Sequence, residues 1–456
     1  MSLSKFESML KTNSVYFFDS VEFEEIIQHY LDNGKHSLAK KAVKLGLEQH
    51  PGSVILKLLK VELLVFEDKL QKASSLISEL EAVEPYNEDL LIQKATIFSK
   101  NNKHVEAINT FKMVLPNTDE KVDIWSMIGM EYLYLDDFVN ARQNFANCID
   151  VDYEDYSSLY NVVYCFDMEN NHEEAIEFLK KYIDTNPYCE VAWHQLGRQY
   201  FVLNRFKEAL RAFDYAVLID ESFIGGYLEK AKTLEELEQY EDAIQNYLIT
   251  LELDDPTAFV YVRTGECYQK LGDLETAVKY YKKAVHEDPL LDKGWLLLTN
   301  LYQEDEQFQK ALYYANKAIQ IDENNSLYWR KYAEINLKLN FFEEVVKAFR
   351  QCLELGDNSI DIFVGLADVL LFLGEFEEAL KTMIKAKNTY KQFAEIEYRL
   401  CGLFMLSDKE KYSLIHLKNG LAIDAEYREI VKELYPTVFE SPKVQVIIDN
   451  FLKATE

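Results

Sequence analysis

An alanine returns every 34 residues along most of this chain, and this spacing constrains the fold more than any other feature. The alanines of the series are Ala39, Ala73, Ala107, Ala141, Ala175, Ala209, Ala243, Ala277, Ala311 and Ala379. Val345 and Ser413 occupy the two further positions at the same spacing. A constant period without insertion or deletion indicates tandem structural units that pack on their neighbours. The sequence therefore predicts a helical solenoid.

Within each period, the apolar residues follow the spacing of two helices. One period contains Trp193, Leu196, Gly197 and Tyr200, followed by Ala209, Phe213 and Ala216. Intervals of three and four residues place each group on one face of a helix. This pattern, W-x2-L-G-x2-Y and then A-x3-F-x2-A, resembles the tetratricopeptide repeat. The resemblance implies an all-α fold, a right-handed superhelical solenoid of antiparallel helix pairs.

Counting from Ser20 divides the chain into twelve units and two ends. The expected units are 20–53, 54–87, 88–121, 122–155, 156–189, 190–223, 224–257, 258–291, 292–325, 326–359, 360–393 and 394–427. Residues 1–19 are expected to form an N-terminal helical cap, and residues 428–456 to form C-terminal capping helices. At this end, Glu426 to Tyr435 reads as one helix that Pro436 breaks. Ser441 and Pro442 then indicate the start of another helix.

Two repeat positions explain how the paired helices meet and turn. Position 8 of each unit is often small, as at Gly129, Gly197 and Gly265, which predicts that the two helices approach most closely there. Position 15 is Gly, Asn or Asp in ten of the twelve units, and the two exceptions are Glu238 and Glu306. Gly, Asn and Asp tolerate the left-handed conformation that ends a helix. We therefore expect the first helix of each unit to end there.

Composition excludes several classes of partner and site. A formal net charge of −29 repels phosphate backbones and anionic lipids, so nucleic acid is not expected as a partner. No apolar run is long enough to span a membrane. The six cysteines show no metal-binding spacing and are typical of a reducing compartment, and no secretory signal is visible, which favours the cytoplasm.

The chain shows no pattern that indicates catalysis. It lacks a glycine-rich phosphate loop, H-E-x-x-H, G-x-S-x-G and a kinase signature, and its eight histidines are scattered. Adjacent carboxylates such as Glu235 and Glu236 point in different directions from a helix. We therefore expect no catalytic residues, no cofactor, no metal and no enzymatic activity.

The family resemblance implies a binding groove lined by positions 2, 5, 6, 9, 12 and 13 of the first helices. In this chain the candidate partner-binding residues at those positions are Met130, Tyr134, Tyr160, Asn161, Tyr164, His194, Arg198, Lys232, Arg263 and Arg330. They form an aromatic and methionine stretch followed by a strip of basic residues. Two alternatives are open for the strip. Its cations either hold carboxylates of a ligand or pair with Glu229, Glu235, Glu266 and Glu334.

These observations favour a non-catalytic scaffold that binds a peptide or helix of a partner protein in its groove. A self-assembling structural subunit and a regulatory accessory subunit of an enzyme complex are the alternatives. A self-assembling subunit would make the chain a homo-oligomer. The sequence does not identify the partner.

Overall fold

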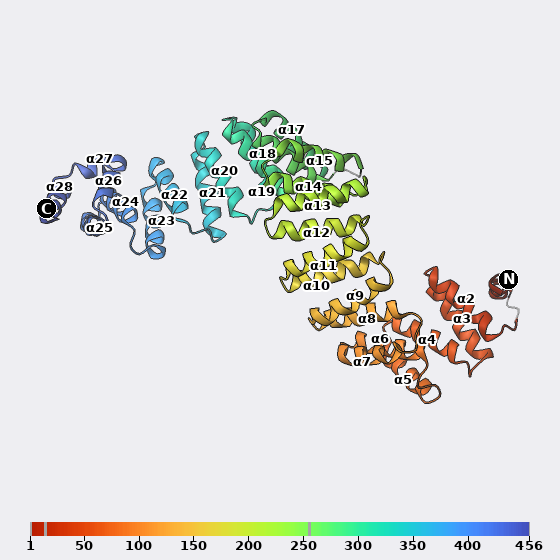
Figure 1. The fold of residues 1–456 in the computed structure, drawn as a ribbon. Coiled ribbons are helices and arrows are strands. Elements are labelled where there is room, and N and C mark those ends of the chain that lie inside the picture. Colours follow the sequence, from red (N-terminus) through yellow and green to blue (C-terminus); the bar gives the residue numbers. More distant parts are fainter. Residues whose placement is uncertain (1, 13–15, 254–256, 456) are drawn as a thin grey trace. The chain divides into compact units, whose positions relative to one another are not determined.

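The computed structural model describes residues 2–12, 16–253 and 257–455, and all of their regular secondary structure is helical. The chain divides into two compact units, residues 1–233 (unit 1) and residues 234–456 (unit 2). The boundary falls within helix α14 (Ile224–Glu236). Each unit is an all-α array in which successive helices lie side by side and alternate in direction (Figure 1).

Unit 1 begins with a single helix, and helix pairs follow. The helices are α1 (Ser2–Thr12), α2 (Ser20–Asp32), α3 (His36–Gln49), α4 (Val54–Phe66), α5 (Leu70–Glu81), α6 (Glu88–Lys100), α7 (His104–Val114), α8 (Lys121–Tyr134), α9 (Phe138–Val151), α10 (Tyr156–Met168), α11 (His172–Thr185), α12 (Glu190–Val202) and α13 (Phe206–Ile219), with α14 at the boundary. The even-numbered helices are the first helices of the pairs.

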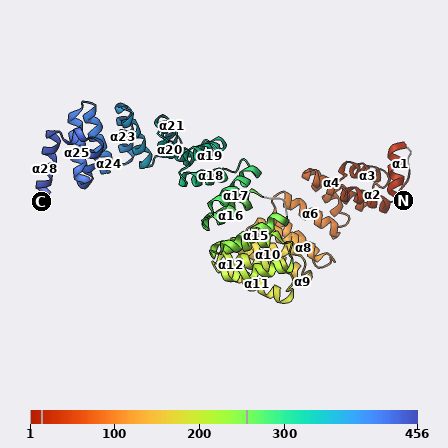
Figure 2. The same ribbon diagram turned by 90° about the horizontal axis from the view of Figure 1, so that it is seen from above.

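Unit 2 continues the same alternation, and its pairs follow one another in chain order (Figure 2). Its helices are α15 (Tyr240–Leu253), α16 (Ala258–Lys270), α17 (Leu274–Glu287), α18 (Asp292–Glu304), α19 (Phe308–Ile321), α20 (Ser326–Lys338), α21 (Phe342–Glu354), α22 (Ile360–Phe372), α23 (Phe376–Thr389), α24 (Ala394–Leu406) and α25 (Glu410–Ile423). The 3₁₀ turn η1 (Glu426–Arg428) and the helices α26 (Glu429–Leu434), α27 (Pro436–Phe439) and α28 (Pro442–Thr455) come after them.

Every residue at position 15 of the repeat adopts the left-handed conformation, as the sequence predicts. The φ angles at these twelve positions lie between 55° and 82°. This includes Glu238 at 58° and Glu306 at 56°, although a side chain with a Cβ is strained in that conformation. The same turn therefore ends each first helix irrespective of the residue that occupies it.

The small residues lie where the helices of a pair meet. All twelve residues of the alanine series, Val345 and Ser413 included, are fully buried. A Cβ placed on Gly197 or on Gly265 would lie 2.5 Å from a ring carbon of Phe213 or Tyr281, respectively. Only a residue without a side chain permits this approach, so the prediction for position 8 is confirmed at these glycines.

Three of the four tryptophans connect their helix to the preceding loop. The indole nitrogens of Trp193 and Trp295 donate to the carbonyl oxygens of Pro187 and Pro289, both at 2.9 Å. Trp329 donates in the same way to Glu323 at 2.8 Å. The same geometry recurs because the same residue type occupies the same repeat position. Packing and hydrogen bonding explain these side chains without a ligand.

The two ends of the chain cover the terminal helix pairs. At the N-terminus, the ring of Phe6 on α1 lies 5.8 Å from that of Phe18 and 6.1 Å from that of Phe23. At the other end, α26 and α27 contact α24. The helical stretch expected from Glu426 to Tyr435 is present over residues 426–434, where η1 is followed directly by the short α26. Pro436 begins α27, where its missing N–H leaves no hydrogen bond unmade.

Candidate functional site

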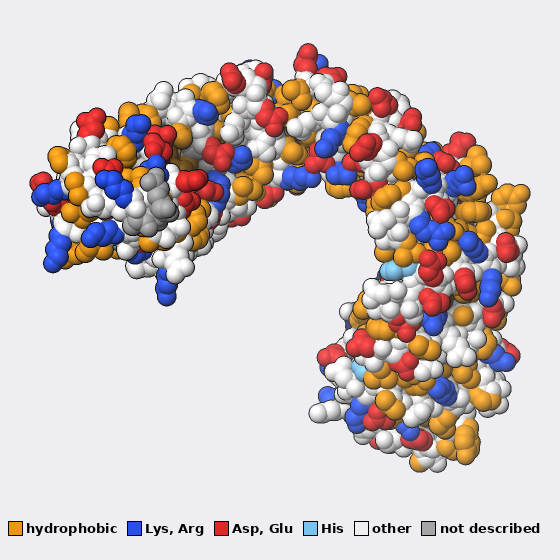
Figure 3. Space-filling model, turned by 60° about the vertical axis from the view of Figure 1, so that its left-hand side comes forward, with side chains coloured by type: hydrophobic (Ala, Val, Ile, Leu, Met, Phe, Trp, Pro, Cys, Tyr) orange, Lys and Arg blue, Asp and Glu red, His pale blue; other side chains and the backbone are white. Residues whose placement is uncertain are grey.

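The expected groove positions all lie on first helices of the pairs. In unit 1 they belong to α8, α10, α12 and α14, and in unit 2 to α16 and α20. Basic and acidic side chains are intermixed on the molecular face shown in Figure 3. The individual contacts therefore decide which of these positions can meet a ligand.

The aromatic and methionine stretch of unit 1 is exposed to solvent. Tyr160 and Tyr164 on α10 are 43% and 48% exposed, and Met130 on α8 is 37% exposed. Asn161 is half-buried beside them on the same helix. Tyr134 is exposed as well, but its ring stacks on the imidazole of His104 at a centroid distance of 5.0 Å. Unit 1 thus presents large apolar side chains at neighbouring repeat positions.

His194 is not an exposed member of the basic strip. Its imidazole lies 5.1 Å from the ring of Phe223 and 5.7 Å from that of Phe213, measured between centroids. Neither ring nitrogen has a hydrogen-bond partner among the described residues. Burial lowers the pKa of His194 to about 4, although Glu229 acts in the opposite direction. The imidazole is therefore neutral at pH 7.

Arg198 and Lys232 complete the candidate residues of unit 1, and they differ in their contacts. Lys232 pairs with Glu229 on its own helix at 2.7 Å. Arg198 is an exposed residue, and its guanidinium donates to the amide oxygen of Gln195 at 3.2 Å. Within the described residues it makes no ion pair with a carboxylate. Arg198 therefore remains available to an acidic group of a ligand.

In unit 2, Arg263 belongs to a closed ionic network. Its guanidinium lies 2.6 Å from Glu235 and 2.8 Å from Glu266. Glu235 also accepts a hydrogen bond from the hydroxyl of Tyr247 at 2.5 Å, and Glu266 pairs with Lys293 at 2.7 Å. Burial raises the pKa of Glu235, while the hydrogen bond from Tyr247 and the charge of Arg263 act to lower it. Arg263 is thus engaged by the protein itself.

Arg330 is paired as well, although its partner differs from the residues expected. It lies 2.8 Å from Asp357 and donates to the hydroxyl of Ser359 at 2.7 Å. The neighbouring Lys331 pairs with Glu334 at 2.9 Å. Of the two alternatives for the basic strip, internal pairing therefore holds for Lys232, Arg263 and Arg330. Arg198 is the exception among the candidate arginines.

Two acidic cavities on the first helices were not anticipated from the sequence. In unit 2, a cavity of about 650 Å³ is lined by Glu235, Glu236 and Arg263, among others. In unit 1, a cavity of about 210 Å³ lies between α2, α4 and α6, with Glu24 and Glu62 in its wall. Burial, with Asp32 and Asp89 nearby, raises the pKa of Glu62. Glu24, Glu62, Glu235 and Glu236 all occupy groove positions of the repeat. These repeat positions are the sequence signal by which the carboxylates could have been found.

Other kinds of site find little support in the described part of the chain. All six cysteines are buried and free, and burial raises the pKa of Cys165 to about 11. No group of His, Cys, Asp and Glu side chains among the described residues is placed to hold a metal ion. None of the described helices has the length and apolar character needed to cross a membrane.

Comparison with known proteins agrees with the repeated helix pairs. Two family models for the tetratricopeptide repeat match residues 126–188 and 258–291. A DnaJ homolog subfamily C member 7 homolog of Dictyostelium discoideum is 24% identical over 200 residues, which cover 40% of this chain and 37% of that protein. The chain thus matches less than half of the length of this relative.

Solved structures of several proteins align with the chain at low similarity. The structure of MamA aligns at 20% sequence identity with a TM-score of 0.34. The alignment covers 36% of this chain and 95% of the MamA chain. YrrB, described as a TPR protein with an unusual peptide-binding site, is 15% identical and covers 39% of this chain and 91% of its own, with a TM-score of 0.34. The APC/C hetero-tetramer Cut9–Hcn1 aligns at 13% identity over 99% of this chain and 92% of its own, with a TM-score of 0.33. The family matches and the observed helix pairs, rather than these alignments, identify the chain as a helical repeat protein that resembles the tetratricopeptide repeat over residues 126–188 and 258–291.

Proposed function

We propose that this chain is a non-catalytic scaffold that binds a peptide or helix of a partner protein on the first-helix face of unit 1. The observation that carries the proposal is the exposed side-chain set of α8 and α10. Exposed apolar side chains that lie together in a patch mark interaction sites, and aromatic residues are common anchors of bound proteins. Repeat arrays bind their partners on extended faces of this kind.

Within this surface, we assign the apolar contacts to Met130, Tyr160 and Tyr164. Tyrosine combines a large contact area with a hydroxyl group, so it suits a surface that is wet in the free state. Asn161, between the two tyrosines, offers an amide to the backbone of an extended peptide. These residues supply hydrophobic contact and hydrogen bonds, which together hold a peptide in one register.

Arg198 supplies the charged contact of the proposed site. Lys232, Arg263 and Arg330 already have carboxylate partners, so recruiting them for a ligand would break an existing ion pair. Arg198 requires no such exchange, and its planar guanidinium is suited to a carboxylate. The proposed ligand therefore carries apolar side chains and an Asp, a Glu or a terminal carboxylate near one end.

We also propose a cytoplasmic location and a role without direct contact with nucleic acid. The buried free thiols support a reducing compartment, where disulfide bonds rarely form. The net charge of −29 opposes a phosphate backbone. A regulatory subunit of an enzyme complex would use the same surface, so it is a special case of this scaffold.

Selection of peptides tests the proposal. Short random peptides displayed on phage are selected on the full chain, and the affinities of enriched peptides are measured by fluorescence anisotropy. Tyr160→Ala, Tyr164→Ala and Arg198→Ala combined should weaken binding by at least about tenfold, which is ~1.4 kcal/mol.

Tyr188→Ala is the matched control, because Tyr188 is 81% exposed in a loop of the same unit. It should leave the affinity unchanged. If the enriched peptides bind the triple variant as tightly as the wild type, the first-helix face of unit 1 is not the binding surface. Circular dichroism establishes that each variant retains its helices.

A further inference from the structure

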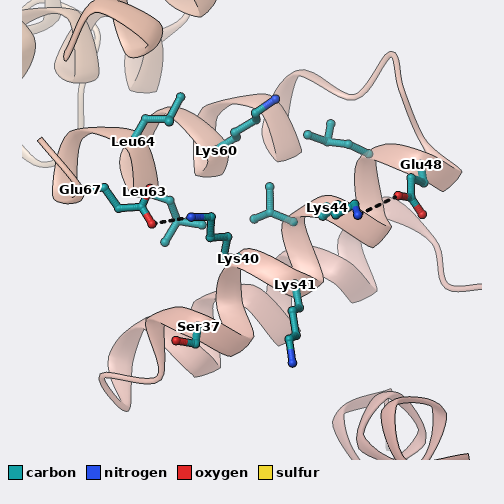
Figure 4. A pocket seen from close by; sticks show the side chains of 11 residues that line it. Ser37, Lys40, Lys41, Lys44, Glu48, Lys60, Leu63, Leu64 and Glu67 are labelled. Atoms are coloured by element: carbon teal, nitrogen blue, oxygen red, sulfur yellow. Dashed lines mark hydrogen bonds and ion pairs between the residues drawn. The ribbon is translucent and has the colours of Figure 1, made fainter. Parts of the chain in front are cut away.

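A cavity of about 630 Å³ opens between α3 and α4 in unit 1, and Figure 4 shows it from close by. Its apolar lining includes Val43 and Leu47 from α3 and Leu63 and Leu64 from α4. The residues of α4 that line it occupy repeat positions other than those of the proposed groove. The cavity is therefore a second surface, distinct from the one on α8 and α10.

The wall that α4 contributes to this cavity differs in sequence from that of other first helices. Lys57, Lys60 and Leu64 occupy repeat positions 4, 7 and 11 of α4. In α18, the same positions hold Trp295, Leu298 and Tyr302. Of the three residues of α4, Lys60 and Leu64 line the cavity, and Leu64 is smaller than the tyrosine at its position in α18. α4 therefore presents no aromatic ring to this cavity.

A smaller cavity of about 390 Å³ lies at the corresponding place between α17 and α18. Tyr302 and Lys282 line it. The ammonium of Lys282 lies 5.8 Å from the centre of the Tyr302 ring. Lys180 and Tyr200 repeat the contact at 5.8 Å. An aromatic ring beneath a lysine is therefore the arrangement that this repeat position accommodates.

Between α3 and α4 the lysine is present and the ring is missing. Lys44 occupies the repeat position of Lys282, and Leu64 occupies that of Tyr302. Lys44 instead lies 3.9 Å from Glu48 on its own helix, a long contact between exposed groups. A ring supplied by another molecule would find the apolar floor and the cation that the intact repeats provide for their own tyrosine.

The rim of the cavity is basic in a strongly acidic protein. Four lysines line it, against two glutamates, whereas the whole chain carries a net charge of −29. Lys40 pairs with Glu67 at 2.7 Å across the gap between the helices (Figure 4). Lys41 on α3 and Lys60 on α4 are exposed and make no ion pair with any described residue. The rim thus offers two uncommitted cations, one on each wall.

We propose that this cavity binds an acidic amphipathic segment of a partner protein. A bulky apolar side chain of the segment, aromatic or leucine, enters the space above Leu63 and Leu64. Asp or Glu residues on either side of it pair with Lys41 and Lys60. Because the two lysines stand on different helices, a segment with several carboxylates meets both, whereas a ligand with one carboxylate meets one.

A selection with two variants tests the proposal. Random peptides displayed on phage are selected on the full wild-type chain and then depleted on Leu64→Tyr, which restores the ring found in the intact repeats. The surviving sequences should carry an aromatic residue or leucine flanked by Asp or Glu. Labelled copies of these peptides should bind Leu64→Tyr, and also Lys41→Glu combined with Lys60→Glu, at least about tenfold more weakly than the wild type.

The corresponding cavity between α17 and α18 provides the control. Lys279→Glu combined with Lys310→Glu makes the same change of charge there and should leave peptide affinity unchanged. Thermal melts separate loss of binding from loss of folding, and the charge variant leaves the apolar packing intact.

Several results would overturn the proposal. Enriched peptides without acidic residues, or peptides that bind every variant equally, would exclude an acidic segment at this site. A wild-type dimer that Leu64→Tyr dissociates in sedimentation velocity would assign the cavity to a second copy of the chain. Retention of dodecanoate by the wild type but not by Leu64→Tyr in native mass spectrometry, without peptide enrichment, would assign it to a fatty acid.

Discussion

Gly197 of α12 lies so close to Phe213 of α13 that a Cβ on the glycine would sit 2.5 Å from the ring carbon Cε1 of the phenylalanine. Gly197→Ala should therefore lower the free energy of unfolding by about 1–3 kcal/mol, although alanine is the better helix former. Urea unfolding, together with hydrogen exchange of the amides in α12 and α13, measures the effect.

Three further variants establish that contact with this ring is the cause. Gly52→Ala should be nearly neutral, because no atom lies within 4 Å of the added Cβ. Phe213→Ala should cost about 3–5 kcal/mol, since it empties a fully buried site. When Phe213→Ala is already present, adding Gly197→Ala should lower the free energy of unfolding only slightly. If the decrease stays as large as in the wild type, contact with the Phe213 ring is not its cause.

Glu238 is the residue at which a glycine should stabilise the protein. Its φ of 58° is the left-handed conformation that the turn after α14 requires. Glu238→Gly removes the clash of the Cβ, while it adds entropy to the unfolded chain. We expect a net gain of roughly 0.5–1 kcal/mol in the free energy of unfolding.

Gln245→Gly is the contrasting variant, because Gln245 is exposed in the interior of α15. Gln245→Gly should lower the free energy of unfolding by about 1 kcal/mol, the usual cost of glycine in a helix. Thermal unfolding of both variants in parallel gives the comparison. Glu238→Gly with a lowered melting temperature would contradict the argument from the turn.

His194 should make unit 1 less stable in acid. Its pKa is lowered to about 4 by burial, whereas an exposed histidine in the unfolded chain has a pKa near 6.5. A group with a lowered folded-state pKa contributes its full stability above the unfolded pKa. That contribution is lost as the pH falls from about 6.5 towards about 4, and it amounts to at most roughly 3 kcal/mol.

His194→Leu should remove this part of the pH dependence, because leucine does not titrate and suits the contacts with Phe213 and Phe223. Urea unfolding near neutral pH and near pH 5 measures the change, with hydrogen exchange in α12 as the local readout. His286→Leu is the control, since His286 is exposed on α17 in unit 2. An unchanged slope with pH in His194→Leu would show that other groups cause it.

Arg263 and Glu235 should depend on each other for stability. The Glu235 side chain is 11% exposed and lies 2.6 Å from the guanidinium. Arg263→Met leaves a carboxylate in a largely buried place without its partner, which should cost about 3 kcal/mol. The double variant Arg263→Met with Glu235→Leu should recover most of this loss, because no uncompensated charge remains.

Arg198→Met is the matched control for this pair, because Arg198 has no carboxylate partner among the described residues. It should change the free energy of unfolding by less than about 0.5 kcal/mol. Urea unfolding of these three variants and the wild type completes the comparison. If Arg263→Met lowers the free energy of unfolding no more than Arg198→Met does, the ionic network does not stabilise unit 2. Arg263 is then available to a ligand.

The helix pairs, their turns and their packed small residues were predictable from the sequence. Each depends on local geometry that recurs with the period, so twelve examples of one position support one another. Glu238 shows how strong this constraint is, since it adopts the turn conformation against its own preference. The C-terminal segment lacks the repeat, yet the helical stretch expected before Pro436 is present there as η1 followed directly by α26.

The candidate binding surface was only partly predictable. Repeat positions identified Tyr160, Tyr164 and Arg198, and the structure shows their side chains exposed. The same reasoning placed His194 beside them, yet its ring is largely buried between phenylalanines. Position within a repeat determines which face a residue occupies, but the neighbouring side chains determine how much of it meets water.

The sequence by itself thus determined the repeated all-helical architecture, because periodic packing and turn geometry act over a few residues. The tertiary structure alone decided which charges are compensated, as when Arg330 meets Asp357, 27 residues further along the chain. It also revealed the cavity beside Leu64, which side chains of α3 and α4 line together. Pairing of charges and the lining of a cavity depend on atoms from different helices, so spacing along the chain does not determine them.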